Sequence, residues 1–398
     1  MTIRQASNNR QAHTIGTAKL ALLAIGTFTL GMDSMVLAGL LPQVASDLQV
    51  SVSTAGQLTT IFAITYAISS PLIATLTGRL DRRTVLAGGM IIFLVGITGQ
   101  ALGTTFLMVA ISRVLAAIGA AGFQANAYAV AGLLAEEGKR GRALATISTG
   151  GTVSTVIGTP FGVLIGQSLG WRTSIWVIAA LAAISALVVP LLPAVRMPAV
   201  ALRQRIRVLG QPRVLAILAG TTLILLPTFA VLSYLPVLAA PVVTGSLLAV
   251  AMVINGGGQV IGNQVAGRVI DARGALPVVI IALAGSLLCL VVLPVARQSA
   301  WSLLLILLLL GCLAGANIVP QQHRLFTVAG DAATTALGLN GSAIYLGIAL
   351  GSAIGGLSLK IIGVGWLPVV AAVLAAFALL IIWTTAPERR AQHSRVHR

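Results

Sequence analysis

Twelve long apolar stretches, separated by short polar or glycine-containing breaks, dominate this sequence. Six fall in the first half of the chain, at about 19–41, 54–76, 85–103, 106–132, 142–167 and 172–193. The other six fall at about 214–238, 246–268, 276–296, 299–321, 333–357 and 364–384. A helix needs about 20 apolar residues to cross a bilayer. We therefore predict an all-α membrane protein of about twelve transmembrane helices, arranged as two pseudo-symmetric six-helix bundles.

The composition excludes an ordinary soluble enzyme. Only 8% of the 398 residues are charged and 57% are hydrophobic, whereas a soluble fold has roughly a quarter of its residues charged. The two cysteines, Cys289 and Cys312, lie inside apolar stretches without CxxC spacing, and the four histidines show no zinc-binding spacing. No residues within the predicted spans have the spacing of a hydrolytic site. We expect no disulfide, no metal, no cofactor and no enzymatic activity.

The net charge of +17 is concentrated in the two tails, in the connection between the halves and in every second loop. Positive residues favour the cytoplasmic side of a membrane. We therefore predict a multi-pass protein of the cell inner membrane with both termini in the cytoplasm, whose partner is the lipid bilayer rather than nucleic acid. The predicted division is a cytoplasmic tail at 1–18, a bundle at 19–193, a cytoplasmic linker at 194–212, a bundle at 213–384 and a cytoplasmic tail at 385–398.

A short charged pattern follows the second apolar stretch of each half and supports an internal repeat. Each copy combines glycine, aspartate and arginine next to a helix end, where carboxylates and arginines interact favourably with the helix dipole. We interpret the pair as an interhelical charge latch on the cytoplasmic side, with plain topological anchoring as the alternative. The residues of this candidate gate are Gly78, Arg79, Asp81 and Arg82 in the first half, and Gly267, Arg268, Asp271 and Arg273 in the second.

Asp33 is the one acidic residue inside a predicted span, and Arg113 is the one basic residue clearly inside another. At 1.5 Å per residue, each lies ~12 Å from the outer end of its helix, so their depths match. A carboxylate at membrane depth normally faces a cavity or a partner and marks an ion or substrate pathway. We interpret Asp33 with Arg113 as a proton-coupling device; the alternative is a fixed structural salt bridge.

Two further sets of residues are functional candidates. Gly158, Pro160 and Gly162 lie in the fifth span, where small residues allow close packing and proline bends the helix. We interpret them as a bend that controls leak between the halves, with ordinary small-residue packing as the alternative. Scattered polar side chains predict a sparsely polar cavity suited to a small neutral or amphipathic solute. These candidate substrate contacts, each of which has a helix-to-helix hydrogen bond as its alternative, are Asn126, Tyr234, Asn255, Gln259, Asn317, Gln321, Asn340 and Tyr345.

These motifs together resemble the major facilitator superfamily, specifically its drug:proton antiporter branch with twelve helices. The resemblance rests on Asp33 nine places before Pro42, on the loop from Gly78, on Arg113, and on the helix 5 segment from Gly158 to Gly162. Exporters of chloramphenicol, sugars and purine nucleosides are the most similar members. The resemblance implies the major facilitator fold, a proton site at Asp33 and an antiporter motif in the fifth helix.

The function that these observations predict is proton-coupled export of a small solute by alternating access of a central cavity. The proton gradient supplies the energy, and we expect a monomer. A proton-coupled uptake symporter of a small metabolite is the alternative, because it uses the same architecture. A sensor or scaffold is disfavoured, because about twelve spans leave no room for a large soluble domain.

Overall fold

The computed structural model describes residues 17–135, 140–195 and 202–385. Within these residues, twelve helices are long and apolar enough to cross a membrane, which confirms the predicted all-α fold. The first half contains α2 (Thr17–Gly39), α4 (Val52–Leu76), α5 (Arg82–Leu102), α6 (Phe106–Leu134), α7 (Arg140–Val153) continuing through η1 (Ser154–Gly158) into α8 (Thr159–Leu169), and α9 (Trp171–Val188). The second half contains α11 (Pro212–Leu232), α13 (Ser246–Arg273), α14 (Ala275–Ala296), α15 (Ala300–Ala329), α16 (Ala333–Ile361) and α17 (Leu367–Thr385).

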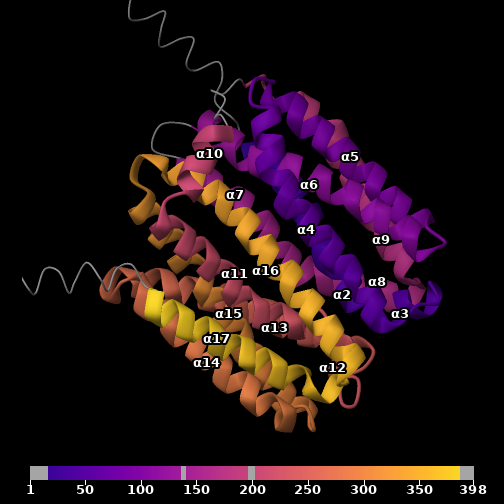
Figure 1. The fold of residues 1–398 in the computed structure, drawn as a ribbon. Helices are drawn as coiled ribbons and strands as arrows, with labels where there is room; N and C mark the ends of the chain where they lie inside the picture. The colour runs from indigo at the N-terminus through magenta and orange to yellow at the C-terminus, as the bar shows by residue number, and fades with distance from the viewer. Residues whose placement is uncertain (1–16, 136–139, 196–201, 386–398) are drawn as a thin grey trace, which may run out of the picture.

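Short helices mark the two ends of the bundle. They are α3 (Leu41–Asp47), α10 (Leu202–Leu209), α12 (Leu235–Ala239), η2 (Val189–Leu191), η3 (Gly330–Ala332) and η4 (Val364–Trp366). The α10 helix lies at one end of the molecule, whereas α3 and α12 lie at the opposite end (Figure 1). We call these ends the linker side and the distal side.

Local sequence signals explain where the long helices begin and end. Ser51 caps α4 by accepting a hydrogen bond from the Thr54 backbone NH at 3.1 Å, and a side-chain oxygen at this position satisfies a donor that the helix leaves unpaired. Gly170 and Gly274 have φ angles of 89° and 79°. Side chains rarely adopt these angles, so glycine permits the sharp reversals between α8 and α9 and between α13 and α14.

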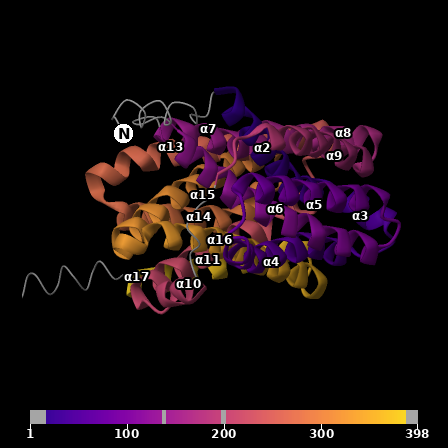
Figure 2. The same cartoon turned by 90° about the horizontal axis from the view of Figure 1, so that it is seen from above.

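The two halves form separate helix bundles that meet along two seams. The indigo-to-magenta helices of the first half gather on one side and the orange-to-yellow helices of the second half on the other (Figures 1 and 2). At one seam α4 packs along α16, and at the other α13 packs against η1 and α8. Any solute pathway between the halves is therefore bounded by these helices.

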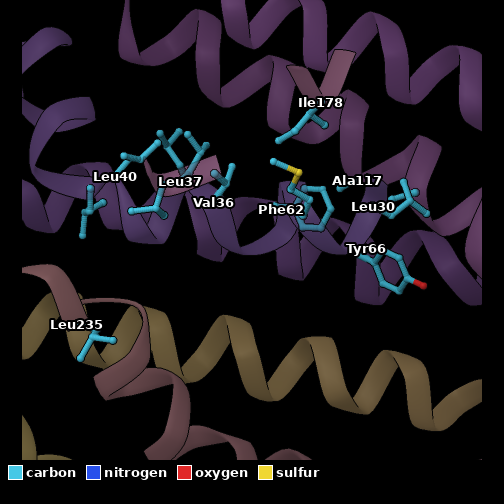
Figure 3. Close-up of a cluster of buried hydrophobic side chains, with 14 of the residues drawn as sticks. Leu30, Val36, Leu37, Leu40, Phe62, Tyr66, Ala117, Ile178 and Leu235 are labelled. Atoms are coloured by element: carbon cyan, nitrogen blue, oxygen red, sulfur yellow. The ribbon is translucent and has the colours of Figure 1, made fainter. Parts of the chain in front are cut away.

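Burial and exposure follow from the apolar environment of the spans. Inside the first bundle, Leu30 and Val36 of α2, Phe62 of α4 and Ile178 of α9 are buried in one cluster (Figure 3). Large apolar side chains also cover the outside, including Trp301, which is 83% exposed. An exposed apolar surface of this extent is costly in water and favourable in lipid.

Candidate functional site

A cavity of about 150 Å³ lies between the halves, enclosed by α2, the bend in the fifth span, α11 and α13. Among the described residues that line it, none carries a charge. Its apolar and glycine lining is Gly31, Met35, Ala38, Gly151, Phe229, Leu232 and Met252, and its polar lining is Ser34, Ser154, Thr155, Thr159, Asn255 and Gln259. A lining of apolar and uncharged hydrogen-bonding groups suits uncharged small molecules.

The structure brings Asp33 and Arg113 together, as their matched depths predict. Arg113 Nη1 donates a hydrogen bond to Asp33 Oδ2 at 2.9 Å, and neither side chain has any exposed surface. Arg113 Nε also donates to the backbone carbonyl of Leu58 at 3.3 Å. The second carboxylate oxygen, Asp33 Oδ1, has no hydrogen-bond partner among the described residues. One oxygen of this carboxylate is therefore held by the arginine, and the other is buried without a partner among the described residues.

The ion pair lies directly behind the cavity wall. Asp33 does not line the cavity, but its chain neighbour Ser34 does, and so do Gly31 and Met35 within one helical turn of it. Asp33 and the cavity are therefore connected through a single turn of α2.

The fifth span departs from a regular α-helix close to the proline at which the sequence predicts a bend. The π-helical turn η1 (Ser154–Gly158) ends two residues before Pro160, which has no NH to give to the preceding turn. Short π-helical segments are frequent at functional sites. A Cβ added to Gly158 would come within 2.8 Å of the Phe28 ring, and one on Gly162 within 2.7 Å of Met32 and Val36. These glycines let the bent helix lie tightly against α2, with Ser154 and Thr155 facing the cavity.

The charged loop after the second span makes its contacts within its own half. Asp81 Oδ1 caps α5 by accepting from the Arg83 NH at 2.8 Å, and it also accepts from the Val195 NH at 3.1 Å. Arg82 is buried and donates to Asn126 Oδ1 of α6 at 3.1 Å. Gly78 accepts from Arg82 through its carbonyl oxygen at 3.2 Å, and Arg79 is exposed.

The matching pattern in the second half lies at the linker-side end of α13. Arg268 and Arg273 are exposed, and Gly267 has open space around it. The side chain of Asp271 lies outside the described residues. The charge latch between the two loops stays a prediction.

Of the eight candidate substrate contacts, Asn255 and Gln259 line the cavity. Asn255 Nδ2 donates to the carbonyl of Leu307 at 2.9 Å, which orients its amide. Gln259 Nε2 donates to Asn255 Oδ1 at 3.0 Å. This pair presents a fixed array of amide atoms to whatever occupies the cavity.

The structure places the other six candidates elsewhere. Asn126 holds Arg82, and Asn317 Nδ2 donates to the carbonyl of Leu313 within its own helix. The remaining four bond or stack with neighbouring helices: Tyr234 donates to the Ser352 carbonyl, Gln321 donates to Thr221, Thr221 donates to Asn340, and Tyr345 stacks on Tyr66.

Sequence reasoning missed the aromatic side chains around the ion pair. The Arg113 guanidinium lies over the ring of Phe62, 4.3 Å from the ring centroid. Tyr66, one turn along α4 from Phe62, stacks on Tyr345 of α16 with ring centroids 3.7 Å apart. The spacing of Phe62 and Tyr66, four residues apart in a helix, is a signal that they share one face. The spacing does not predict which neighbouring helix packs against that face.

Known proteins similar to this chain agree with the architecture. The family model described as Major Facilitator Superfamily matches residues 23–329 and 242–397. A chloramphenicol resistance protein of Streptomyces lividans is 36% identical over 393 residues, covering 92% of this chain and 97% of the relative. The inner membrane transport protein YdhP of Escherichia coli strain K12 is 30% identical over 380 residues, covering 92% of this chain and 95% of the relative.

Solved structures show the same fold. The nucleoside transporter NupG superposes with a TM-score of 0.74 at 12% sequence identity, covering 92% of this chain and 99% of NupG. The xylose transporter XylE from E. coli superposes with a TM-score of 0.72 at 18% identity, covering 92% of this chain and 97% of XylE. The chain belongs to the major facilitator superfamily, and it is a multi-pass membrane transporter rather than an enzyme.

Proposed function

We propose that this transporter exports a small neutral or amphipathic solute in exchange for protons, with Asp33 carrying the coupling proton. The observation that carries the proposal is the geometry of the buried carboxylate. Oδ2 is paired with Arg113, whereas Oδ1 is buried without a hydrogen-bond partner among the described residues. An ionisable side chain buried in a membrane span is costly, and such residues commonly mark ion or proton pathways.

Proton binding at Oδ1 changes the balance of forces at this pair. The carboxylate loses its charge, and with it the Coulomb attraction that holds the fully buried Arg113, which is strong at low dielectric constant. Arg113 then retains the backbone carbonyls of Leu58 and Asp33 and the Phe62 ring as partners. The α2 and α6 helices are free to change their relative positions, and α2 forms one wall of the cavity. No cofactor is required, because the proton gradient supplies the energy.

The cavity lining supports an uncharged solute. Ser34, Thr155, Asn255 and Gln259 offer hydrogen bonds, and the other walls are largely apolar. An ionic solute would be desolvated there without a countercharge, which costs several kcal/mol or more. The similarity to a chloramphenicol resistance protein supports a drug as solute, and a nucleoside or sugar fits the same description.

The distribution of charge supports the direction of insertion. The basic residues gather in the tails, the linker and the linker-side loops. By the positive-inside rule this places the linker side and both termini in the cytoplasm. Export then means that solute enters from the linker side. The protein is proposed to act as a monomer in the inner membrane.

The experiment that tests this function measures efflux directly. Cells lacking their main efflux pumps are loaded with radiolabelled chloramphenicol, a purine nucleoside or a sugar, with and without this protein. We expect faster efflux of at least one uncharged compound, abolished by a protonophore. Protonophore-sensitive accumulation inside the cells would instead identify an uptake symporter. Insensitivity of all transport to the protonophore would contradict proton coupling.

A further inference from the structure

The seam where α4 of the first half packs along α16 of the second contains an aromatic cluster that reaches the buried ion pair. Tyr345 of α16 contributes from the second half, and Phe62 and Tyr66 of α4 contribute from the first. The Tyr66 and Tyr345 rings stack at 3.7 Å between centroids with their planes inclined by 26°. The Phe62 and Tyr345 rings are 6.2 Å apart and inclined by 51°. Tyr345 therefore contacts both aromatic residues of α4.

Phe62 also supports Arg113. The guanidinium carbon lies 4.3 Å from the centroid of the Phe62 ring, within the range of a cation–π interaction. On its other side Arg113 pairs with Asp33 at 2.9 Å. Four side chains on four helices thus form one continuous series of contacts: Asp33 of α2, Arg113 of α6, Phe62 of α4 and Tyr345 of α16.

We infer that Tyr345 is a positioning residue that links the charge state of Asp33 to the second half of the protein. This inference rests on the proposed function, because it assumes that Asp33 takes up the coupling proton. Arg113 is the charged group in contact with Asp33 among the described residues. Beyond Phe62 the titratable groups are Tyr66 and Tyr345, and Tyr128 of α6 is close enough to interact electrostatically with both. When Asp33 is neutral, the charge attraction to Arg113 is lost, and the backbone carbonyl of Asp33, 3.4 Å from Arg113 Nη1, is the acceptor that is unaffected on that side. Arg113 then shifts, and the Phe62 ring on which it lies moves with it.

The contact with Tyr345 gives that movement a consequence across the seam. Stacked rings tolerate sliding but lose attraction when they separate or tilt away. A shift of Phe62 therefore changes the fit of Tyr345, and α16 adjusts by moving relative to α4. Packed interfaces of this kind switch between discrete arrangements rather than deforming continuously. The halves then rock in response to one proton.

The test measures the distance between the halves in lipid nanodiscs, without a solute. Spin labels are attached to cysteines introduced as Leu76→Cys in α4 and Phe326→Cys in α15, both exposed positions, in a background carrying Cys289→Ser and Cys312→Ser. We expect the distance distribution to shift by several ångström between mildly acidic and mildly alkaline buffer. Tyr345→Leu is expected to lose more than half of that shift, and Tyr345→Phe to retain it, because phenylalanine keeps the stacked ring.

Two controls separate this inference from simpler explanations. Phe377→Leu removes an exposed ring of α17 in the same half and is expected to leave the shift unchanged. Asp33→Asn is expected to abolish it. If Tyr345→Leu shows the full pH-dependent shift in distance and Asp33→Asn shows none, the role of Tyr345 is overturned and the proposed proton site stands. The role of Tyr345 and the proton site at Asp33 are both overturned if the shift persists in Asp33→Asn. They are also both overturned if the protein with Asp33 and Tyr345 unchanged shows no shift.

A folding defect does not leave the question open. If Tyr345→Leu does not yield monodisperse protein, Tyr345→Met keeps the volume without a ring, and Phe62→Leu removes the same contact from α4. Tyr345→Met decides the question where it folds: loss of the shift supports the inference, and a full shift overturns it. Phe62→Leu is used where neither Tyr345 variant folds, and a full shift there overturns the series of contacts from Arg113 to Tyr345.

Discussion

Ser53 Oγ donates a 2.6 Å hydrogen bond to the backbone carbonyl of Gly356, which lies 303 residues further along the chain. Ser53 is in the first turn of α4 and Gly356 is near the end of α16, so this bond joins the two halves at the distal side. The side chain of Tyr234 lies beside it, with its hydroxyl donating to the Ser352 carbonyl at 3.0 Å. The distal end of the α4–α16 seam is therefore closed by direct contacts.

We expect Gly56→Ala and Gly356→Ala to destabilise this distal closure. A Cβ on either glycine would collide with the hydroxyl of Tyr234. Met35→Cys in the cavity wall, in the cysteine-free background, should become reactive toward a membrane-impermeant thiol reagent added from the distal side. Gly88→Ala is the matched control, because a Cβ there has open space around it. Equal reactivity in all three variants would contradict a role of Tyr234 in closure.

We expect Asp33→Asn to abolish solute accumulation driven by a pH gradient while leaving solute binding measurable. The asparagine mimics the protonated acid in shape but takes up no proton. Purified protein in vesicles with an imposed gradient provides the measurement. Asp47→Asn is the control, since Asp47 pairs with Arg172 and Trp171 at the distal side, outside the spans. Gradient-driven accumulation by Asp33→Asn at the unmodified rate would refute the coupling role.

We expect Arg113→Ala to impair transport as well. Removing the arginine leaves a fully buried carboxylate without its cation, and breaking one partner of such a pair costs about 3–5 kcal/mol. The loss should appear both as a lower melting temperature and as reduced gradient-driven transport. In the double variant Asp33→Asn with Arg113→Ala, the melting temperature should recover part of the loss, because no buried charge remains unpaired. A double variant less stable than both single variants would argue against this pairing energy.

We expect Gln259→Leu to weaken solute binding about tenfold, the effect of one lost hydrogen bond at ~1.4 kcal/mol. Gln259 faces the cavity and bonds to Asn255. Gln264→Leu, an exposed position on the same helix, should bind normally. Equilibrium binding of the solute identified by the efflux assay is the measurement. Unchanged affinity in Gln259→Leu would place the solute elsewhere.

We expect Asp81→Ala to lower stability by about 1 kcal/mol through loss of the α5 cap, and Asp81→Asn to retain it. Asparagine keeps the oxygen that accepts from Arg83 and Val195. Thermal unfolding in detergent measures the difference. A charge latch predicts a different result: Asp81→Asn and Asp271→Asn would each change which side of the cavity is accessible to thiol reagents, at unchanged stability.

We expect reporter fusions to place both termini and the linker in the cytoplasm. The prediction follows from the basic residues on the linker side. A fusion of alkaline phosphatase after Pro212 should be inactive, and one after Gln298 should be active. High activity after Pro212 would reverse the proposed orientation.

The amino-acid sequence alone determined the spans and the depth of each residue within them. The hydropathy and the length of each apolar stretch are local properties, and the twelve helices follow from them. The repeat of the two halves and the family resemblance follow from short motifs, which are also local. Depth also brought Asp33 and Arg113 to the same level. The proline and glycines of the fifth span likewise predicted a bend where the structure has the π-helical turn.

The tertiary structure alone decided what each side chain faces. Depth along a helix does not fix rotation around its axis, and rotation depends on how neighbouring helices pack. For this reason Asn126, predicted at the cavity, instead holds Arg82, while Asn255 and Gln259 reach the cavity. Tyr345 meets Tyr66 and Phe62 only because α16 packs along α4 across the seam. Contacts between segments some 280 residues apart arise from packing of complementary surfaces, which no local pattern in the chain specifies.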